Sequence, residues 1–401
     1  MNEASERSRP RLWPPVVAVA AFYLVFVATR LLEHGVIWFV HIGREMLEAA
    51  DSSAVLTPDL GWESDIGYDG QYYYAVAVDP ANAADYMRGG NAGYVFARPL
   101  YPALSRTVAL GQVDFVPHAM LLINLVAVIA GTLAIAVWLR RNDVSPWFSV
   151  LYGLYPGLVF SVFRDLTEPL AFGLVAVALW LFDPKDRRRV LAAAAILALA
   201  ALTRETVILF ALAAAGVIAV SADGRSWWAW TRWRLATLFL GLALMPLIVC
   251  KAVVGVLIGE PTQESPGGAF VFLPFYGIGA QWPWDAQDVL VVIAVVIPTL
   301  LAVILALPLL RCRSSRICGA LLMLNAAAFV VFLPKVVYVD FGAASRAALG
   351  VVLAMICCIP AWKASGIKLT GVHVMCFTWS LPWYLVASAV LGLPGIDLVT
   401  L

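Results

Sequence analysis

Long apolar runs separated by short charged segments constrain this chain most strongly. A helix that crosses the roughly 30 Å hydrocarbon core of a bilayer needs about 20 consecutive apolar residues. Runs of about this kind cover residues 14–32, 116–139, 145–163, 168–182, 190–203, 206–220, 235–258, 287–310, 317–334, 346–362 and 370–392. We therefore expect an all-α polytopic membrane protein with about eleven transmembrane helices, within a range of roughly ten to twelve.

The composition favours a bilayer over water as the surrounding medium. Of 401 residues, 62% are hydrophobic and 13% are charged, and the mean hydropathy is +0.86. The 27 Lys+Arg and 26 Asp+Glu residues are too few to cover the outside of a soluble monomer of this size. The formal net charge of +1 gives no basis for a nucleic acid partner, and no Cys or His clustering predicts a metal site. We expect membrane lipids as partners, and no cofactor.

Basic residues predict the orientation of the chain, because Lys and Arg concentrate in cytoplasmic connections. The Arg-rich N-terminus, 140–141, 185–189, 225–234, 311–316 and the lysines at 363 and 368 lie at alternate connections. This places the N-terminus in the cytoplasm, with the run 14–32 as a retained first helix and not a cleaved signal peptide. The expected outer segments are then 33–115, 164–167, 203–206, 259–286, 335–345 and the C-terminus. We expect one transmembrane domain over 1–401, with interfacial helices in 33–115 and no separate soluble domain.

The segment 65–74 is the sharpest candidate for chemistry. It contains Asp65 and Asp69, and glycines at 67 and 70 allow the backbone to turn tightly there. A carboxylate beside such a turn can approach a substrate closely. Gln71 and Tyr72 follow directly. The alternative is a solvated loop whose polar residues serve only to form the turn.

Two charged turns between apolar runs form further candidates. Arg164, Asp165 and Glu168 occupy the first, and Arg204 and Glu205 occupy the second. Ionisable side chains at membrane depth are costly, and they usually face a cavity or a partner. A capped hairpin with an Arg–Asp pair is the structural alternative for the first turn. Arg204 is the better phosphate-binding candidate, because a guanidinium group presents a planar fork to oxyanions.

Three more cations belong to the same predicted side of the membrane. Lys335 and Arg346 flank one outer connection, and Arg98 lies in another. Lys and Arg side chains at helix ends also extend to the membrane interface without any functional role, and this reading stays open. The agreement between several clusters on one side carries the functional inference, since each cluster is weak alone.

The order of these segments resembles one known family. The sequence carries 65–74, then Asp79 and Pro80, then 98–102, then 156–157 with 164–169, and then 202–206. This order resembles the bacterial cell-surface glycopolymer formation proteins. They are related to membrane glycosyltransferases of the GT-C class, which include polyprenyl-phosphate-sugar-dependent mannosyltransferases and the enzyme that adds the second mannose to GPI anchors. Outside 65–206, only hydropathy and the turn from Lys335 to Arg346 match.

The resemblance implies a GT-C-like many-helix fold with a catalytic carboxylate in the first outer loop. That carboxylate corresponds to Asp69, and Asp65 matches less closely. The expected substrate-binding residues are Gln71, Tyr72, Arg98, Arg164, Asp165, Glu168, Arg204, Glu205, Lys335 and Arg346. Many GT-C enzymes carry a soluble extracytoplasmic C-terminal domain, and we expect this chain to differ from them, because the sequence ends shortly after its last apolar run. Acceptor recognition is therefore expected from the outer loops.

The expected activity is inverting transfer of a sugar from a polyprenyl-phosphate donor to an extracytoplasmic glycan or lipid acceptor, in the bacterial plasma membrane. Asp69 would act as general base on the acceptor hydroxyl, with Asp65 assisting. Arg204, Arg164 and Arg346 are the candidates to stabilise the leaving phosphate. A lipid-phosphate leaving group carries little charge, so no metal is strictly required. Two other classes stay open: a lipid-linked-sugar flippase or transporter, which needs alternating access, and a non-catalytic assembly protein.

Overall fold

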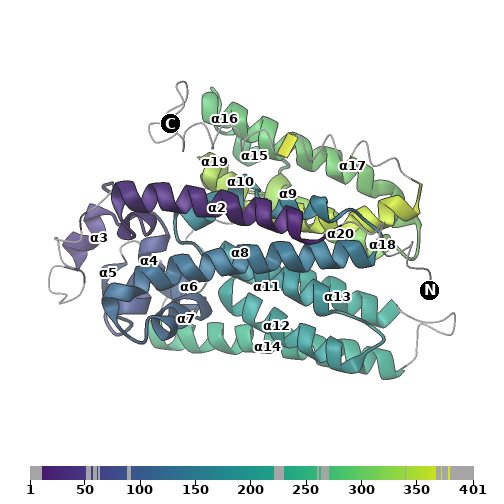
Figure 1. Ribbon diagram of the computed structural model, residues 1–401, viewed down its shortest axis with the longest axis horizontal. Coiled ribbons are helices and arrows are strands. Elements are labelled where there is room, and N and C mark those ends of the chain that lie inside the picture. Colours follow the sequence, from purple (N-terminus) through teal and green to yellow (C-terminus); the bar gives the residue numbers. More distant parts are fainter. Residues whose placement is uncertain are drawn as a thin grey trace.

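The computed structural model describes residues 11–50, 56, 61, 64–87, 92–220, 230–259, 262, 271–338, 340–366, 372 and 378–379. These residues form helices and no β-strand, apart from one isolated bridge between Gly43 and Ser64. The longer helices lie side by side along the long axis of the molecule (Figure 1). The all-α expectation is therefore confirmed for the described part of the chain.

Within the described residues, four helical stretches are long and apolar enough to cross a membrane. They are α2 (Trp13–His34), η3 (Val113–Phe115) with α8 (Val116–Arg141), α14 (Trp230–Ile258), and the continuous helix formed by α16 (Ala286–Val291), η7 (Val292–Val296) and α17 (Ile297–Arg311). Two bent pairs pass the same test together. These are Pro146–Gly153 with α10 (Pro156–Phe163), bent by 47°, and α19 (Phe341–Ala347) with α20 (Leu349–Ala364), bent by 41°. With each bent pair taken as one span, the total rises to six.

Several expected spans are shorter in the structure than a bilayer requires. They are α11 (Glu168–Leu181), α12 (Arg187–Thr203), η5 (Glu205–Val207) with α13 (Ile208–Val220), and α18 (Arg316–Ala326) with η8 (Ala327–Val331). α12 has 17 residues and is about 25 Å long at 1.5 Å per residue. The expected run 370–392 lies outside the described residues except at 372, 378 and 379. The structure thus shows a multi-pass arrangement with four to six long candidate spans, and the count of eleven stays a prediction.

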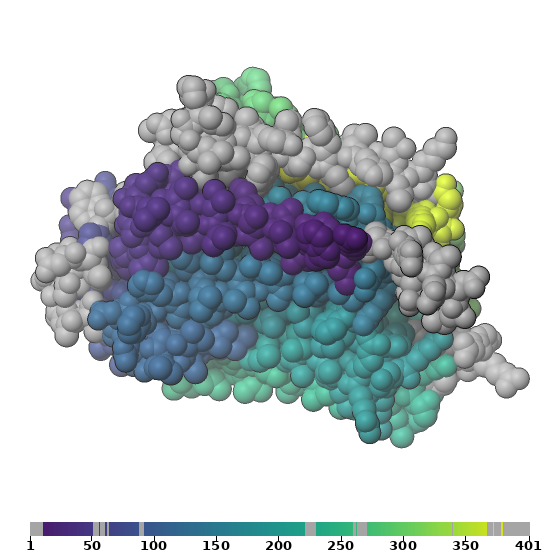
Figure 2. Space-filling view, in the orientation of Figure 1, coloured from purple at the N-terminus to yellow at the C-terminus, as the bar shows by residue number. Residues whose placement is uncertain are grey.

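Exposed apolar side chains on the long helices account for the high hydropathy. Figure 2 shows α2 beside α8 on one face of the molecule. On α2, Leu24 is 72% exposed and Leu32 is 88% exposed, and on α14, Val256 is 83% exposed. Such surfaces are stable in contact with lipid chains and costly in water.

Short helices gather at one end of the bundle, on the left in Figure 1. They are η1 (Ile37–Phe39), α3 (Arg44–Ala49), α4 (Gly70–Val78), α5 (Ala83–Tyr86), α6 (Ala92–Phe96) and α7 (Leu100–Val108). Their buried side chains form an apolar cluster of their own with the first turns of α8, including Met46, Tyr73, Tyr101 and Met120. Short helices are present where the sequence predicts them, and their position at a membrane surface stays a prediction.

Glycines allow three backbones to approach closely at this end of the molecule. A Cβ added to Gly157 of α10 would overlap the Ser345 carbonyl group and lie 2.8 Å from the Arg346 nitrogen. A Cβ at Gly342 of α19 would lie 2.5 Å from the Phe160 ring. One at Gly70 would overlap the carbonyl oxygen of Arg164. α10, α19 and the start of α4 are thus held together by backbone contact.

Two π-helical turns flank α19. η7 interrupts the helix from α16 to α17, and η8 ends the helix that begins with α18. Both contact α19, the helix that carries Arg346. A π turn contains one residue more than an α turn, and it often occurs near a functional site.

Candidate active site

Asp69 lies where the first loop enters α4. The close approach of Gly70 to the Arg164 backbone positions this residue against the turn before α11. The Asp69 side chain is 49% exposed, and its Oδ2 accepts a hydrogen bond from Arg346 Nη2 at 3.1 Å. One carboxylate therefore joins a solvent-accessible surface to a buried cation.

Arg346 bridges two carboxylates. Its Nε lies 2.9 Å from Glu168 Oε1, while its Nη2 bonds to Asp69. The side chain is only 10% exposed, and its guanidinium carbon lies 5.2 Å from the centre of the Tyr68 ring. Burial is the main cause that raises the pKa of Tyr68, so this phenol stays neutral beside the guanidinium.

Glu168 lies between two guanidinium groups. It is the first residue of α11 and is 1% exposed. The same oxygen that faces Arg346 lies 2.9 Å from Nη1 of Arg204, the residue after α12. We call Asp69–Arg346–Glu168–Arg204 the ion-pair chain.

Arg98 and Glu205 form a second buried pair beside this chain. Arg98 Nη2 donates to Glu205 Oε1 at 2.7 Å, and Nε donates to Oε2 at 3.1 Å, which is the bidentate geometry of strong Arg–carboxylate pairs. Arg98 also donates to the Tyr73 hydroxyl at 2.9 Å. Burial is the largest single influence and acts to lower the pKa of Arg98, but Glu205, Tyr73 and Tyr94 together outweigh it, and the pKa lies well above its usual value. Three carboxylates and three guanidinium groups thus balance in formal charge across both sets.

Asp165 is buried in a separate polar group. Its Oδ1 accepts from Asn124 Nδ2 at 3.3 Å, and the same amide donates to the Tyr101 hydroxyl at 2.8 Å. The residue adopts a left-handed conformation with φ of 47°, which turns the chain sharply before Glu168. Burial raises the pKa of Asp165 well above its usual range. This side chain serves the turn and lies apart from the ion-pair chain.

Arg164 faces aromatic rings. Its guanidinium carbon lies 4.5 Å from the centre of the Phe163 ring and 5.9 Å from that of Trp38. Together with burial, which is the larger cause, this cation lowers the pKa of the neighbouring His41 to about 4. Arg164 therefore lies under the first loop and touches the site through its carbonyl group at Gly70.

Gln71 supports the loop with both ends of its amide. Its Oε1 accepts from the Gly43 nitrogen at 2.8 Å, and its Nε2 donates to the Ile66 carbonyl at 2.9 Å. Tyr72 is partly buried against the apolar cluster of the short helices. In this structure Gln71 holds the backbone that carries Asp69.

Like Asp165, two further predicted site residues lie away from the ion-pair chain. Asp65 pairs with Arg44 at 3.0 Å, and both side chains are exposed, at 64% and 51%. Lys335 begins η9 (Lys335–Tyr338), and its side chain is also exposed. The structure therefore brings together Asp69, Arg346, Glu168 and Arg204 with Arg98 and Glu205, and it places Asp65 and Lys335 outside that group.

Sequence reasoning missed several partners of the site. Asp340 caps α19, because its Oδ1 accepts a hydrogen bond from the Ala343 nitrogen at 2.7 Å. An Asp directly before a helix is a common N-cap, so the sequence could have indicated this role. Asn124 is a lone amide in a long apolar run, which is also a signal. No local pattern indicates Tyr68, Tyr73 or Arg44, since their partners lie far along the chain or across a loop.

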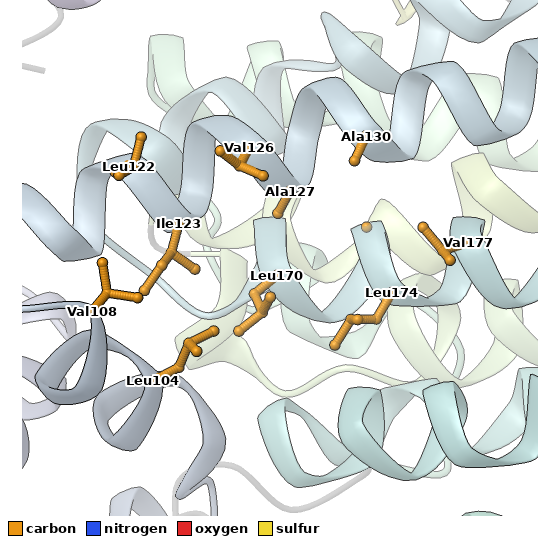
Figure 3. A pocket seen from close by; sticks show the side chains of 11 residues that line it. Leu104, Val108, Leu122, Ile123, Val126, Ala127, Ala130, Leu170, Leu174 and Val177 are labelled. Carbon is orange, nitrogen blue, oxygen red and sulfur yellow. The ribbon is translucent and has the colours of Figure 1, made fainter. Parts of the chain in front are cut away.

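An apolar groove of about 330 Å³ lies on another side of α11. Figure 3 shows Leu170, Leu174 and Val177 lining it across from α8. Leu170 follows Glu168 by two residues, or about 200° around the helix axis. The groove therefore faces away from the ion-pair chain and is a separate feature.

The described residues hold no group of three or more His, Cys, Asp or Glu side chains arranged to bind a metal ion. No protein-family model, curated protein or solved structure matches the chain. The family resemblance thus rests on the order of motifs in the sequence, and the site rests on its geometry.

Proposed function

We propose that this chain is an inverting membrane glycosyltransferase that transfers a sugar from a polyprenyl-phosphate donor to an extracytoplasmic glycan or lipid acceptor. The observation that carries this proposal is the direct bond between a half-exposed carboxylate, Asp69, and a buried arginine, Arg346. A base that an acceptor can reach and a cation that can face a phosphate are the two groups that such a transfer needs.

In the proposed reaction, Asp69 accepts the proton of the acceptor hydroxyl. The acceptor oxygen attacks the anomeric carbon from the side opposite the phosphate. The bond between that carbon and the phosphate oxygen breaks, and its electron pair stays on the oxygen. Attack from the opposite side inverts the anomeric centre.

Buried guanidinium groups stabilise the charge on the leaving phosphate. Arg346 and Arg204 are 10% and 11% exposed, and Arg98 is 3% exposed. Charge-assisted hydrogen bonds are strongest where water is excluded and donors are held in place. The ion pairs with Glu168 and Glu205 fix these arginines before a substrate binds.

The placement of Asp65 changes its proposed role. Its pair with Arg44 connects the loop to the start of α3, so Asp65 supports the loop and Asp69 alone acts as the base. The order of motifs supports the same assignment, since Asp69 is the position that matches the family pattern more closely.

The competing classes make different use of the same charges. A flippase moves a headgroup between the two sides and commonly uses broken helices near the middle of the membrane. Two helix pairs are bent here as well, and Arg346 lies on α19, the short half of one of them. The ion-pair chain nevertheless connects a loop residue, the start of α11 and the end of α12, which favours chemistry at one end of the bundle. A non-catalytic assembly protein would tolerate neutral substitutions at Asp69 and Arg204.

The test uses purified protein in nanodiscs with a panel of polyprenyl-phosphate-linked sugars and candidate acceptors. Wild-type protein is expected to consume a donor and release the polyprenyl phosphate, and Asp69→Asn to reduce the rate by about 10²–10⁴-fold. Asp85→Asn, an exposed carboxylate of the same loop, is the matched control and is expected to keep the wild-type rate. A donor left intact by wild-type protein would favour a flippase, and full activity of Asp69→Asn would remove the base.

A further inference from the structure

Arg346 has a donor atom that the ion-pair chain does not use. Its Nη2 donates to Asp69, and its Nε lies 2.9 Å from Glu168 Oε1 in an ion pair. Neither Nε nor Nη1 has a hydrogen-bond partner among the described residues. The side chain is nine-tenths buried, and a buried guanidinium N–H without an acceptor is costly. The Nη1 atom is therefore available to donate a hydrogen bond to an anionic ligand.

We propose that Arg346 couples the two halves of the reaction, exchanging its bond to Asp69 for a bond to the lipid phosphate when Asp69 takes up the acceptor proton. This inference rests on the proposed function and assigns the order of charge movement within that site.

The charges balance in such an exchange. A phosphodiester donor carries one negative charge, and the departing lipid phosphate carries two. Asp69 loses its negative charge at the same step, because it receives the proton of the acceptor hydroxyl. One negative charge therefore disappears beside Nη2 of Arg346 as one appears on the phosphate, and the guanidinium group can serve both without leaving its place.

The structure holds Arg346 in place during the exchange. Glu168 Oε1 lies 2.9 Å from its Nε and equally close to Nη1 of Arg204, so the buried carboxylate attracts both guanidinium groups. The backbone of α19 is held against α10 by the contact at Gly157. Loss of the Asp69 bond would thus leave the guanidinium oriented, with Nη1 and Nη2 presented as a fork. A fork of two N–H groups suits two phosphate oxygens.

Neutralisation of residue 69 should then strengthen phosphate binding even without a reaction. Asp69→Asn imitates the protonated carboxyl, since it removes the charge that occupies Arg346 and nearly preserves the shape. A purely structural salt bridge predicts the reverse, because breaking it would loosen Arg346 and weaken any ligand bound there.

The experiment titrates full-length protein in phosphatidylcholine nanodiscs with undecaprenyl monophosphate, and with uncharged undecaprenol as the reference lipid. Tryptophan fluorescence reports binding. We expect wild-type protein to prefer the phosphate, Asp69→Asn to bind it about tenfold more tightly, and Arg346→Gln to bind it at least about tenfold more weakly. The double variant should bind as weakly as Arg346→Gln, with no gain from the change at 69.

Two controls separate coupling from misfolding. Asp85→Asn should leave both affinities unchanged, and Arg346→Lys, which keeps the charge without the fork, should bind more weakly than wild type and retain part of the preference for phosphate. Equal or weaker binding by Asp69→Asn overturns the coupling, as does a gain from Asp69→Asn in the absence of Arg346. In either case a wild-type preference for phosphate leaves the proposed function standing. A wild-type protein that does not distinguish undecaprenyl monophosphate from undecaprenol overturns both.

Discussion

Asp65 and Asp69 lie four residues apart in one loop, and the structure gives them opposite surroundings. Asp65 pairs with Arg44 on an exposed surface. Asp69 pairs with Arg346, which is 277 residues away along the chain and nearly buried. A carboxylate that supports the loop is thus distinguished from a candidate base by the residue with which it pairs, and not by its local sequence.

The two surroundings also differ in energy. Exposed ion pairs contribute little to stability, because water and salt screen the attraction. Removal of one partner from a buried pair leaves an uncompensated charge and costs several kcal/mol. Four substitutions test this contrast between the loop surface and the ion-pair chain.

Glu168→Gln is expected to have the largest effect. It leaves Arg346 and Arg204 buried without their shared acceptor charge, and it should lower the free energy of unfolding by about 3 kcal/mol. Reversible unfolding by sodium dodecyl sulfate in mixed micelles measures the change. Glu45→Gln, an exposed carboxylate on α3, is the control. A loss for Glu168→Gln no larger than that of the control would mean that the ion-pair chain is not formed.

Gly157→Ala tests the backbone contact that aligns Arg346. The added Cβ would overlap the Ser345 carbonyl group, so α10 and α19 must separate, at a cost of about 2 kcal/mol. Unfolding of the variant measures this cost. Gly241→Ala on α14 is the matched control, since nothing lies within 4 Å of its added Cβ, and it should be neutral or stabilising. Similar stabilities for the two variants would argue against close packing at Gly157.

The pH dependence of stability tests the surroundings of His41, which lies beside Arg164. Its pKa is lowered to about 4 in the folded state, against about 6.5 when unfolded. Below pH 6.5 the unfolded chain takes up a proton that the folded chain does not, so stability should fall as the pH drops from about 6.5 towards 4.

His41→Asn removes this titration and tolerates the left-handed conformation at that position, where φ is 55°. Wild-type protein should lose about 1 kcal/mol more than this variant between pH 7.5 and 5, after allowance for partial exposure of the imidazole. Unfolding midpoints at both pH values give the comparison. Parallel losses in the two proteins would show that His41 is not held neutral.

Asp65→Asn should have the smallest effect. Its pair with Arg44 is exposed, so unfolding should change by about 0.5 kcal/mol or less, and the difference should shrink in high salt. Transfer activity should fall by no more than about twofold, the change in rate that about 0.5 kcal/mol produces. A loss as large as that of Asp69→Asn would restore Asp65 to a catalytic role.

The sequence predicted the helical class well, because apolar runs and basic connections depend only on local composition. It also predicted that charges between apolar runs need partners, and Arg204 and Arg346 do both contact Glu168. The helix count was less predictable, since charged turns at 164–167 and 203–206 end the helices before they reach full spanning length.

The pairing within the site could not be predicted from the sequence. Arg204 and Glu205 are neighbours in the chain, yet Arg204 pairs with Glu168 and Glu205 pairs with Arg98. Adjacent side chains at a helix end point in different directions, so each finds a partner on another element. The close contact at Gly157 was equally hidden, because a glycine in an apolar run does not reveal which backbone approaches it.

The π turn η7 beside α19 allows the two ends of one helix to face different surroundings independently, which a regular α-helix does not. In a regular α-helix each residue is rotated by about 100° from the one before it, so the direction of one side chain determines the directions of all the others. The extra residue in η7 breaks that relation between α16, which contacts α19, and α17 beyond it. The end of the helix that contacts α19 can therefore be oriented for that contact, while the other end keeps apolar residues such as Ile304 exposed on the outside of the bundle.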